Sequence, residues 1–539
     1  MKNRPDCLHH PAEWDTITSM HRITIFHYHL QTGGITQVIA DSVYSVLQEA
    51  PDQFKIQIVS GRQEQTDEFI ARLNDRVPSP VNAEVFSMVD YTDMMDNPPD
   101  PARLGQEMLR RYGGTTWWIH NYHIGKNPQF TRAVVDIALQ HPEQRIVLHI
   151  HDFPESGRFL NLKKIQSQMD DVLYPVCPNV RYAVINSRDY HILTKAGIPE
   201  NHVFLLNNPV NAEGNGFIDI WSVHDKINRW ALDKLPFWHE NGKLILYPIR
   251  AIRRKNVLEA ALLTKLLDTP ANLLVTLPGR SNQEKQYSDL VERAFEEKLV
   301  PGAWALGTHL EEFETSFNEL THSADLIVSS SIQEGFGYLF INSILWSVPL
   351  VARDLDILDG IKPLFTPDSS HFYREITVPL SAAEHADLQT VFQQGIEDLT
   401  GLLPAGIISN LTDEVEQVLA ADTIDYAFLT PELQYALLER TSRSPEYRSE
   451  LIELNAEVAA VTGNLLRGSK PADKRKVLRK FGPAAHTDQI LSILDSFADS
   501  KTENTAITGD SPLAGSGSIE AEVLKAFGHP GYFRPLFHM

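Results

Sequence analysis

Cysteine is almost absent from this chain. Only Cys7 and Cys177 occur among its 539 residues, and they lie far apart in the sequence. So few cysteines exclude a disulfide framework and any zinc site built mainly from thiolates. We therefore expect a reducing environment and a cytoplasmic protein.

Long apolar runs are also missing. No stretch approaches the roughly 20 apolar residues that a membrane-spanning helix needs. The first residues, MKNRPDCLHHPAEWDTITSM, lack the apolar core of a secretory signal. We therefore expect no integral membrane segment.

Basic residues are outnumbered by acidic ones. The sequence contains 48 lysines and arginines against 70 aspartates and glutamates, which gives a formal net charge of −22 at pH 7. The field of such a chain repels phosphate backbones, so we expect no nucleic acid among its partners. A phosphorylated ligand would have to be bound by a local group of cations.

Alternating strands and helices dominate what the sequence does contain. The segment ITIFHYHL (23–30) is typical of a strand, and a glycine turn and a helix with regularly spaced apolar residues follow it. The pattern returns with the strand-like segments FKIQIVSG, TTWWIHNYH, RIVLHIHDF, YAVINS and VFLLNNPV. This alternation predicts a parallel sheet with helices on both faces.

A second series of the same kind begins at KLILYPI (243–249) and continues through ANLLVTLPG, AWALGTH and ADLIVSSS. Two such series predict an α/β protein with two Rossmann-like domains that face a central cleft. The predicted parts are an N-terminal extension (1–21), a first domain (22–215), a second domain (216–498) with an insertion at about 360–420, and a linker with a C-terminal tail (499–539).

The loop in YPIRAIRRKNVLEAALL combines a strand end, several cations and a helix start. Arg250 and Lys255 flank this loop, and the helix begins near Asn256. Fixed positive charge at such an edge is suited to stabilising a departing diphosphate. The alternative is a solvated surface loop, above all for Arg253 and Arg254.

The stretch SSSIQEGFGYLFINSILW places one carboxylate on a glycine turn before a helix. Gly335 and Gly337 let backbone N–H groups approach a ligand, and Glu334 can accept hydrogen bonds from sugar hydroxyls or balance a cation. The alternative is that Glu334 is simply an acidic residue favoured at a helix start.

The order of these two motifs resembles the second half of retaining GT-B glycosyltransferases of the family 4 type. The segments INSRDYHILTKAGIPENHVFLLNNPVN and KVLRKFGPAAHTDQILSIL also resemble parts of that family. The resemblance implies that Arg250 and Lys255 meet the donor diphosphate and that Glu334 holds the sugar. It implies that Gly335, Phe336 and Gly337 form the donor-binding turn.

One position departs from the family pattern. The family's second glutamate, eight residues after the first, is replaced here by Asn342. A carboxylate bound to a ribose diol contributes about 1.5 to 3 kcal/mol, whereas a neutral amide contributes about 0.5 to 1.5 kcal/mol. We expect Asn342 to meet the ribose with altered affinity or nucleotide preference.

The first domain is expected to hold the acceptor. Gly33 and Gly34 form a tight turn after the first strand, although a turn that merely starts a helix is an equal alternative. Several polar residues fall at neighbouring strand ends and suggest a carbohydrate pocket, while a purely structural role for them is the alternative: His120, His123, His149, His151 and Asp152. The resemblance implies that His151 faces the donor sugar.

No metal or other cofactor is expected. His27 and His29 point the same way from one strand and form a conceivable metal pair, but no third ligand stands at a suitable spacing. Asp354 and Asp356 imitate the D-x-D motif of metal-dependent glycosyltransferases of another fold, and we interpret this as a chance match. P-loop and nucleophile-elbow motifs are absent from the sequence.

The resulting hypothesis is a retaining glycosyltransferase that transfers a sugar from a nucleotide-diphosphate donor to a hydroxyl acceptor. A small soluble acceptor is one form of this hypothesis. The alternatives are a GT-B enzyme with another reaction, such as a nucleotide-sugar epimerase or a phosphorolytic enzyme, and a catalytically silent binding protein. For the final segment, GYFRPLFHM, three roles stay open: covering the cleft, returning to the first domain, or pairing subunits in a homo-oligomer.

Overall fold

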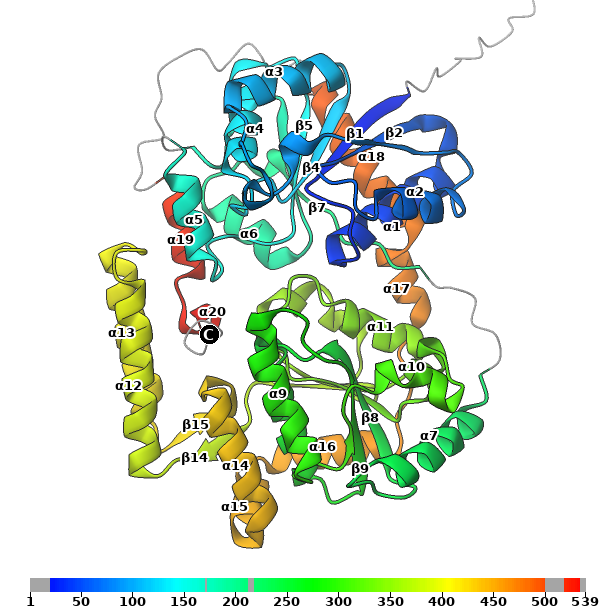
Figure 1. Cartoon of the computed structure of the whole chain (residues 1–539), viewed down its shortest axis with the longest axis vertical. Helices are drawn as coiled ribbons and strands as arrows, with labels where there is room; N and C mark the ends of the chain where they lie inside the picture. The colour runs from blue at the N-terminus through cyan, green and yellow to red at the C-terminus, as the bar shows by residue number, and fades with distance from the viewer. Residues whose placement is uncertain (1–19, 170–171, 212–217, 500–517, 534–539) are drawn as a thin grey trace, which may run out of the picture.

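The computed structural model describes residues 20–169, 172–211, 218–499 and 518–533. Two α/β domains lie one above the other, the first at the top and the second at the bottom of Figure 1. Each is built on one parallel sheet with helices on its faces. The predicted N-terminal extension and the linker lie almost wholly outside the described residues.

The first domain contains a seven-stranded parallel sheet with the strand order β3-β2-β1-β4-β5-β6-β7. Its strands are β1 (His21–His27), β2 (Phe54–Ser60), β3 (Asn82–Val85), β4 (Thr116–His120), β5 (Ile146–Ile150), β6 (Val180–Val184) and β7 (Val203–Leu205). Its helices are α1 (Gly34–Glu49), α2 (Thr66–Asn74), α3 (Pro101–Tyr112), α4 (Pro128–Gln140), α5 (Phe159–Gln166) and α6 (Ser187–Lys195).

The central strands of this sheet are buried along their whole length. In β4, β5 and β6 every residue is buried, as a sheet covered on both faces requires. The order of strands reverses between β1 and β4, so the chain leaves these two strands in opposite directions. Ligands of open α/β sheets bind beyond the carboxyl ends of the strands at such a point.

The second domain repeats the arrangement with six parallel strands in the order β10-β9-β8-β11-β12-β13. The strands are β8 (Lys243–Arg250), β9 (Ala271–Leu277), β10 (Gly302–Ala303), β11 (Leu326–Ser329), β12 (Leu350–Arg353) and β13 (Ser370–Tyr373). The helices are α7 (Ile220–Lys234), α8 (Val257–Leu266), α9 (Asn282–Glu296), α10 (Phe317–Ser323), α11 (Tyr338–Trp346), α14 (Pro431–Arg443), α15 (Pro445–Leu454), α16 (Ala456–Arg467) and α17 (Lys474–Phe481).

The region predicted as an insertion divides into two parts. Its beginning still belongs to the domain, because β13 pairs with β12 as the edge strand of the sheet. The rest is a helical hairpin, α12 (Ala382–Leu399) and α13 (Ala405–Leu419), which stands on a two-stranded antiparallel ribbon of β14 (Thr377–Pro379) and β15 (Thr423–Asp425). In Figure 1 the hairpin rises beside the second domain toward the first.

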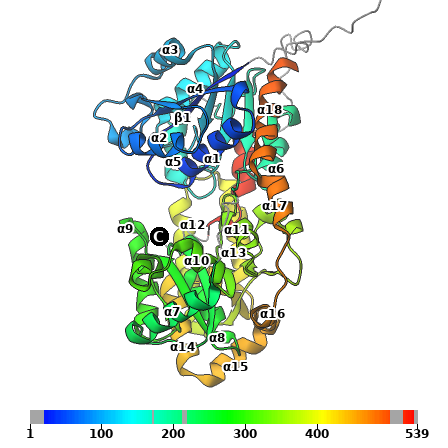
Figure 2. The same ribbon diagram turned by 90° about the vertical axis from the view of Figure 1, so that its right-hand side faces the viewer.

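The chain returns to the first domain after the second. Helix α18 (Pro483–Asp499) packs against α1, and its residues Ile490, Ile493 and Phe497 share a core cluster with β1 and β2. Figure 2 shows α17 and α18 running up one side of the molecule from the second domain to the first. Although α18 falls in the range predicted for the second domain, it covers the sheet of the first.

The described part of the tail consists of α19 (Ile519–Phe527) and the short α20 (Pro530–Phe533). Helix α19 contacts α6 of the first domain, and α20 contacts α13 of the hairpin. The three roles left open by the sequence concern GYFRPLFHM, of which residues 531–533 are described, and its Tyr532 lines the space between the domains. Residues 534–539 lie outside the described residues. Within the described ranges, no helix is long and apolar enough to cross a membrane.

Candidate active site

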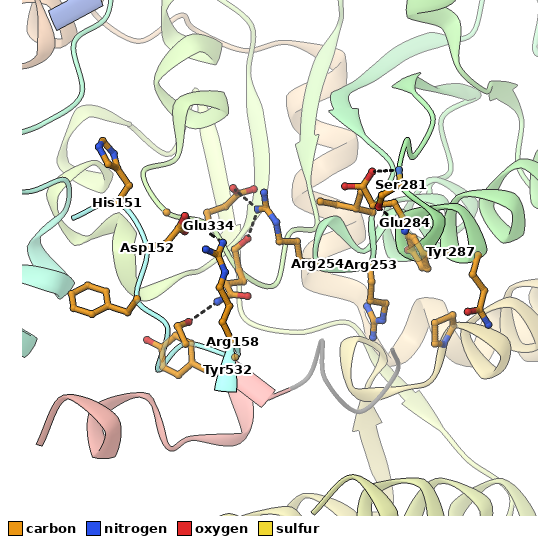
Figure 3. Close-up of a pocket in the computed structure, with 18 of the residues that line it drawn as sticks. His151, Asp152, Arg158, Arg253, Arg254, Ser281, Glu284, Tyr287, Glu334 and Tyr532 are labelled. Carbon is orange, nitrogen blue, oxygen red and sulfur yellow. Dashed lines mark hydrogen bonds and ion pairs between the residues drawn. The ribbon is translucent and has the colours of Figure 1, made fainter. Parts of the chain in front are cut away.

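A cleft of about 720 Å³ lies between the two domains. It is lined from the first domain by the segment that follows β5, and from the second domain by the loops that follow β8 and β11 and by the first turns of α9 and α14. The described tail contributes Tyr532. Figure 3 shows Glu334, Arg254, Asp152 and Arg158 close together, with the His151 ring directed away from them. Both domains thus present the carboxyl ends of central strands to the cleft.

The end of β8 and the loop that follows it contain four cations with different environments. Lys255 and Arg254 reach Glu334, while the guanidinium of Arg250 lies 4.0 Å from Glu284. Arg253 donates to the backbone carbonyls of Ala427 (3.1 Å) and Leu429 (3.0 Å). The interpretation of Arg253 as a solvated surface residue is therefore wrong, because its guanidinium connects the loop to the segment after β15.

Glu334 is the centre of this charge cluster. Its carboxylate forms an ion pair with Lys255 and accepts a hydrogen bond from Arg254 Nη1 at 3.2 Å. Burial raises the pKa of Glu334, but the charges of Lys255 and Arg254 outweigh burial and lower the pKa to about 2. Burial lowers the pKa of Lys255 to about 8, against the opposing effect of Glu334. Both groups are charged at neutral pH.

The glycine turn after Glu334 brings the two domains into contact. Asn186 Nδ2 of the first domain donates to the carbonyl oxygen of Gly335 at 2.8 Å. Gly337 has φ +91°, which disfavours any residue with a side chain, and it precedes α11. Phe336 is buried and packs edge-on against Phe481, so its side chain belongs to the core.

A buried ionic network supports the loop from behind. Arg353 of β12 donates to Glu259 of α8 at 2.7 and 2.6 Å and to Asp425 of β15 at 3.0 Å. Asn256, which has φ +52° at the start of α8, donates to Glu259 at 2.7 Å. Sequence reasoning missed this network, although a glutamate in the apolar helix VLEAALL was a visible signal.

The first-domain wall begins with Asp152 and His151. Asp152 pairs with Arg158 at 3.3 Å. Burial raises the pKa of Asp152, but Arg158 and Arg254 outweigh it and lower the pKa, so Arg254 acts across the cleft. His151 is buried, and its backbone N–H donates to Asn121 Oδ1 at 2.7 Å. Burial lowers the pKa of His151 to about 4, so its ring is neutral at pH 7.

Three buried histidines lie together behind this wall. One ring nitrogen of each of three histidines, His120, His149 and His151, lies within 4.8 Å of the other two. This spacing could admit a metal ion. However, Trp118 Nε1 donates to His149 Nδ1 at 3.1 Å, so the proton of the neutral His149 ring lies on Nε2. His120 Nδ1 and His151 Nε2 are 2.8 Å apart and share a hydrogen bond. These contacts fit neutral, hydrogen-bonded rings better than metal ligands.

Other predicted site residues lie away from the residues that line the cleft. Asn342 is half-buried on α11, and its side chain forms no hydrogen bond with another described residue. Gly33 has extended backbone, and the space in front of Gly34 is open, so neither conformation requires glycine. His123 is fully buried, and burial lowers its pKa to about 3. The two aspartates of the D-x-D match form ion pairs, Asp354 with Lys362 and Asp356 with Arg188.

Several lining residues were missed at the level of sequence. Ser281 caps α9, and Glu284 completes the capping box by accepting from the backbone N–H of Ser281 at 3.2 Å. The S-x-x-E spacing was a readable signal for the helix start, but nothing in it pointed to the cleft. Arg188 and Tyr532 come from segments more than 300 residues apart, and no sequence pattern links them.

The sequence comparison places the chain in a family. Mannosylglucosyl-3-phosphoglycerate synthase of Petrotoga mobilis is 30% identical to it over 518 residues, which cover 94% of this chain and 98% of that protein. This chain belongs to the GT-B glycosyltransferases of the family 4 type that include the Petrotoga synthase. No protein-family model matches the chain.

Solved structures with a related course of the chain include HepE of Anabaena in complex with UDP-glucose. It has 11% identity and a TM-score of 0.49, and the match covers 88% of this chain and 99% of HepE. Sucrose-phosphate synthase of Thermosynechococcus elongatus has 12% identity and a TM-score of 0.40, with 83% and 98% covered. At these values neither structure indicates a substrate for this chain.

Family membership confirms the predicted class of fold and of reaction. The chain is a GT-B hexosyltransferase that uses a nucleotide sugar. The prediction of two Rossmann-like domains agrees with the two parallel sheets. The roles of individual residues in this GT-B enzyme stay predictions.

Proposed function

We propose that this enzyme transfers a mannosyl group from a nucleoside-diphosphate mannose to glucosyl-3-phosphoglycerate, with retention at the anomeric carbon. The proposal takes the product named for the Petrotoga relative and the order of its sugars, in which mannosyl is the outer unit. The acceptor would then be a small, hydroxyl-rich and anionic molecule.

The observation that carries the proposal is the cluster of Lys255, Arg254 and Glu334 at the carboxyl ends of β8 and β11. In this proposal Arg254, which lines the cleft, binds the departing diphosphate together with Lys255 and Arg250. Lys255 and Arg250 do not line the cleft in this arrangement of the domains, so their contact with the diphosphate requires a rearrangement when donor binds. The charges of Lys255 and Arg254 are held in place before the reaction by Glu334 and by the loop's backbone contacts, so little further reorganisation is needed when negative charge develops.

Glu334 has two functions in this scheme. Without donor it neutralises two cations that would otherwise repel each other in a partly buried space. With donor bound, the diphosphate takes over part of that neutralisation, and the carboxylate becomes free to accept hydrogen bonds from mannosyl hydroxyls. His151, held neutral by burial, contacts the far side of the same sugar.

Asn342 would pair with the ribose diol through its amide, and the Gly33-Gly34 turn would border the acceptor. Neither residue lines the cleft in this arrangement of the domains, so both assignments require the cleft to narrow or extend when substrates bind. Asp152 and its partner Arg158 would contact the acceptor from the first-domain side.

The test is a reaction with purified enzyme, glucosyl-3-phosphoglycerate and nucleoside-diphosphate mannoses that differ in the base. Mass spectrometry should show a product larger by one hexosyl unit. The one-bond C1–H1 coupling of the new mannosyl unit in the NMR spectrum should show the same anomeric configuration as the donor. Donor without acceptor and the Lys255→Ala variant serve as controls.

Three results would contradict the proposal. A product with inverted anomeric configuration would contradict retention. Transfer of a sugar other than mannose, or transfer only to another acceptor, would contradict the substrate assignment. Donor isomerised in the absence of acceptor would indicate a nucleotide-sugar epimerase, which is the alternative that shares this architecture.

A further inference from the structure

The described tail is anchored to the first domain by a polar and an apolar contact. The Glu520 carboxylate accepts hydrogen bonds from the backbone N–H groups of Leu173 (2.7 Å) and Tyr174 (3.2 Å). Val523 and Phe527 have no exposed surface, and the Phe527 ring lies 5.1 Å from that of Phe153. Since Phe153 follows Asp152 in the cleft wall, the tail packs directly behind this wall.

Beyond Phe527 the tail reaches into the space between the domains. Tyr532 donates its hydroxyl hydrogen bond to Asp356, which belongs to the second domain. The guanidinium of Arg188, from α6 of the first domain, lies 5.4 Å from the Phe527 ring and 5.6 Å from the Tyr532 ring. It also lies 3.3 Å from Asp356. First domain, second domain and tail therefore meet at Tyr532.

Tyr532 lines the same cleft as Glu334 and Asp152 (Figure 3). The cations that we assign to the diphosphate, Lys255 and Arg254, belong to the second domain. Tyr532 shares its end of the cleft with Arg188 and Arg158 of the first domain, each of which is paired with a carboxylate. Paired charges with fixed donors and acceptors suit sugar hydroxyls better than a free anion, and an aromatic ring can cover the apolar face of a sugar.

We propose that Tyr532 is a substrate-binding residue that contacts the glucosyl unit of the acceptor, so the C-terminal tail forms part of the acceptor site. This inference rests on the proposed function for the identity of the acceptor. It goes beyond it by assigning acceptor specificity to a segment outside both Rossmann-like domains.

The test compares KM values for acceptor and donor in Tyr532→Ala and Tyr532→Phe. Tyr532→Ala should raise the acceptor KM about tenfold, the loss expected from one ring contact and one hydrogen bond, and leave the donor KM within about twofold. Tyr532→Phe keeps the ring and should raise the acceptor KM about two- to threefold. Lys525→Ala, on α19 of the same tail but outside the cleft, should match the parent enzyme.

Glu520→Ala separates contact from anchoring. It removes the carboxylate that holds the tail to Leu173 and Tyr174 without touching the cleft, so the acceptor KM should rise by less than in Tyr532→Ala. Thermal unfolding of each variant identifies any that fails to fold, and Tyr532→Phe then decides. Equal rises in donor and acceptor KM, or no rise in either, would overturn the proposal.

A second readout does not need turnover. In enzyme with 3-fluorotyrosine at position 532, the ¹⁹F signal should shift on addition of glucosyl-3-phosphoglycerate, or of glucose at high concentration, and not with nucleoside diphosphate alone. If the parent enzyme does not use glucosyl-3-phosphoglycerate, the proposed function fails, while the glucose arm still reports on Tyr532. A signal that responds only to the nucleotide would overturn the assignment to the acceptor.

Discussion

The charged cluster around Glu334 in the second domain differs in its electrostatics from the buried histidines of the first domain. In the second domain Lys255 and Arg254 flank Glu334, and Lys255 and Glu334 are both charged at neutral pH. In and behind the first-domain wall, burial lowers the pKa values of His120, His149 and His151, so these rings are neutral. Of the three, His151 lines the cleft, beside the ion pair of Asp152 and Arg158. The comparison teaches where each kind of group is useful: fixed charge suits a departing diphosphate, and neutral imidazoles suit an uncharged sugar.

The largest effect is expected from removing the support of the charged cluster. Arg353→Met would leave the buried carboxylates Glu259 and Asp425 without their cation, and we expect the free energy of unfolding to fall by about 3 to 5 kcal/mol. Urea denaturation measures this. Arg443→Met, which removes an exposed ion pair with Glu439, should change it by less than about 1 kcal/mol. Equal effects would show that the network adds no support.

Loss of charge at the diphosphate should come next. Lys255→Ala is expected to lower kcat about 100-fold or more, the usual size for one charge-stabilising donor, and Arg250→Ala by a similar factor. Initial rates at saturating donor measure this. Lys470→Ala, which removes an exposed lysine paired with Asp368, is the matched control. Turnover as fast as the parent's would refute the assigned roles.

The pH profile should distinguish the charged cluster from the buried histidines in a single experiment. Because the pKa of Lys255 is lowered to about 8, kcat/KM for the donor should fall about tenfold per pH unit above pH 8, as the ammonium loses its charge. Lys255→Arg should abolish this limb, because a guanidinium stays charged. No limb near pH 6.5 should arise from His151, whose pKa is about 4. A change in kcat/KM centred near pH 6.5 would show that a histidine titrates there, and would contradict the contrast between Lys255 and a neutral His151.

A smaller effect is expected among the buried histidines. His151→Ala should lower kcat/KM by up to about tenfold, the value of one neutral hydrogen bond to the sugar. His141→Ala, at an exposed histidine beside Glu143, provides the control. If His151→Ala reduced the rate as strongly as Lys255→Ala, the first-domain wall would have more than a sugar-contacting role.

The smallest change concerns the ribose. Asn342→Glu restores the carboxylate of the family pattern and should lower the donor KM about fivefold, the difference of roughly 1 kcal/mol between a charged and a neutral hydrogen bond. Asn342→Ala should move it in the opposite direction. A donor KM that is indifferent to both changes would place residue 342 outside the donor site.

The parts of the fold that the sequence predicted are those with local signals. Buried strands such as RIVLHI and ADLIVSSS stand out by composition, and the Glu334 turn by its glycines. The start of the predicted insertion was placed too early because β13, with the sequence SHFY, is short and half polar at the edge of its sheet. Local patterns of this kind carry no signal of strand pairing.

The rest depends on contacts between distant residues. Arg353 and Asp425 are ordinary charged residues until folding buries them together. The same holds for Tyr532 and Arg188, and for α18, whose apolar face fits either domain until α1 is in place. Such pairs have no spacing rule, so a single sequence could not reveal that the tail lines the cleft.

The contacts around Asp425 also constrain how the domains move. Strand β15 ends at Asp425, which is bonded to Arg353, and Arg253 holds the carbonyls of Ala427 and Leu429 just beyond it. These hydrogen bonds join the base of the α12-α13 hairpin to the loop after β8, so we expect the two to move as one rigid unit. When the second domain rotates relative to the first, the hairpin must therefore move together with the cation loop.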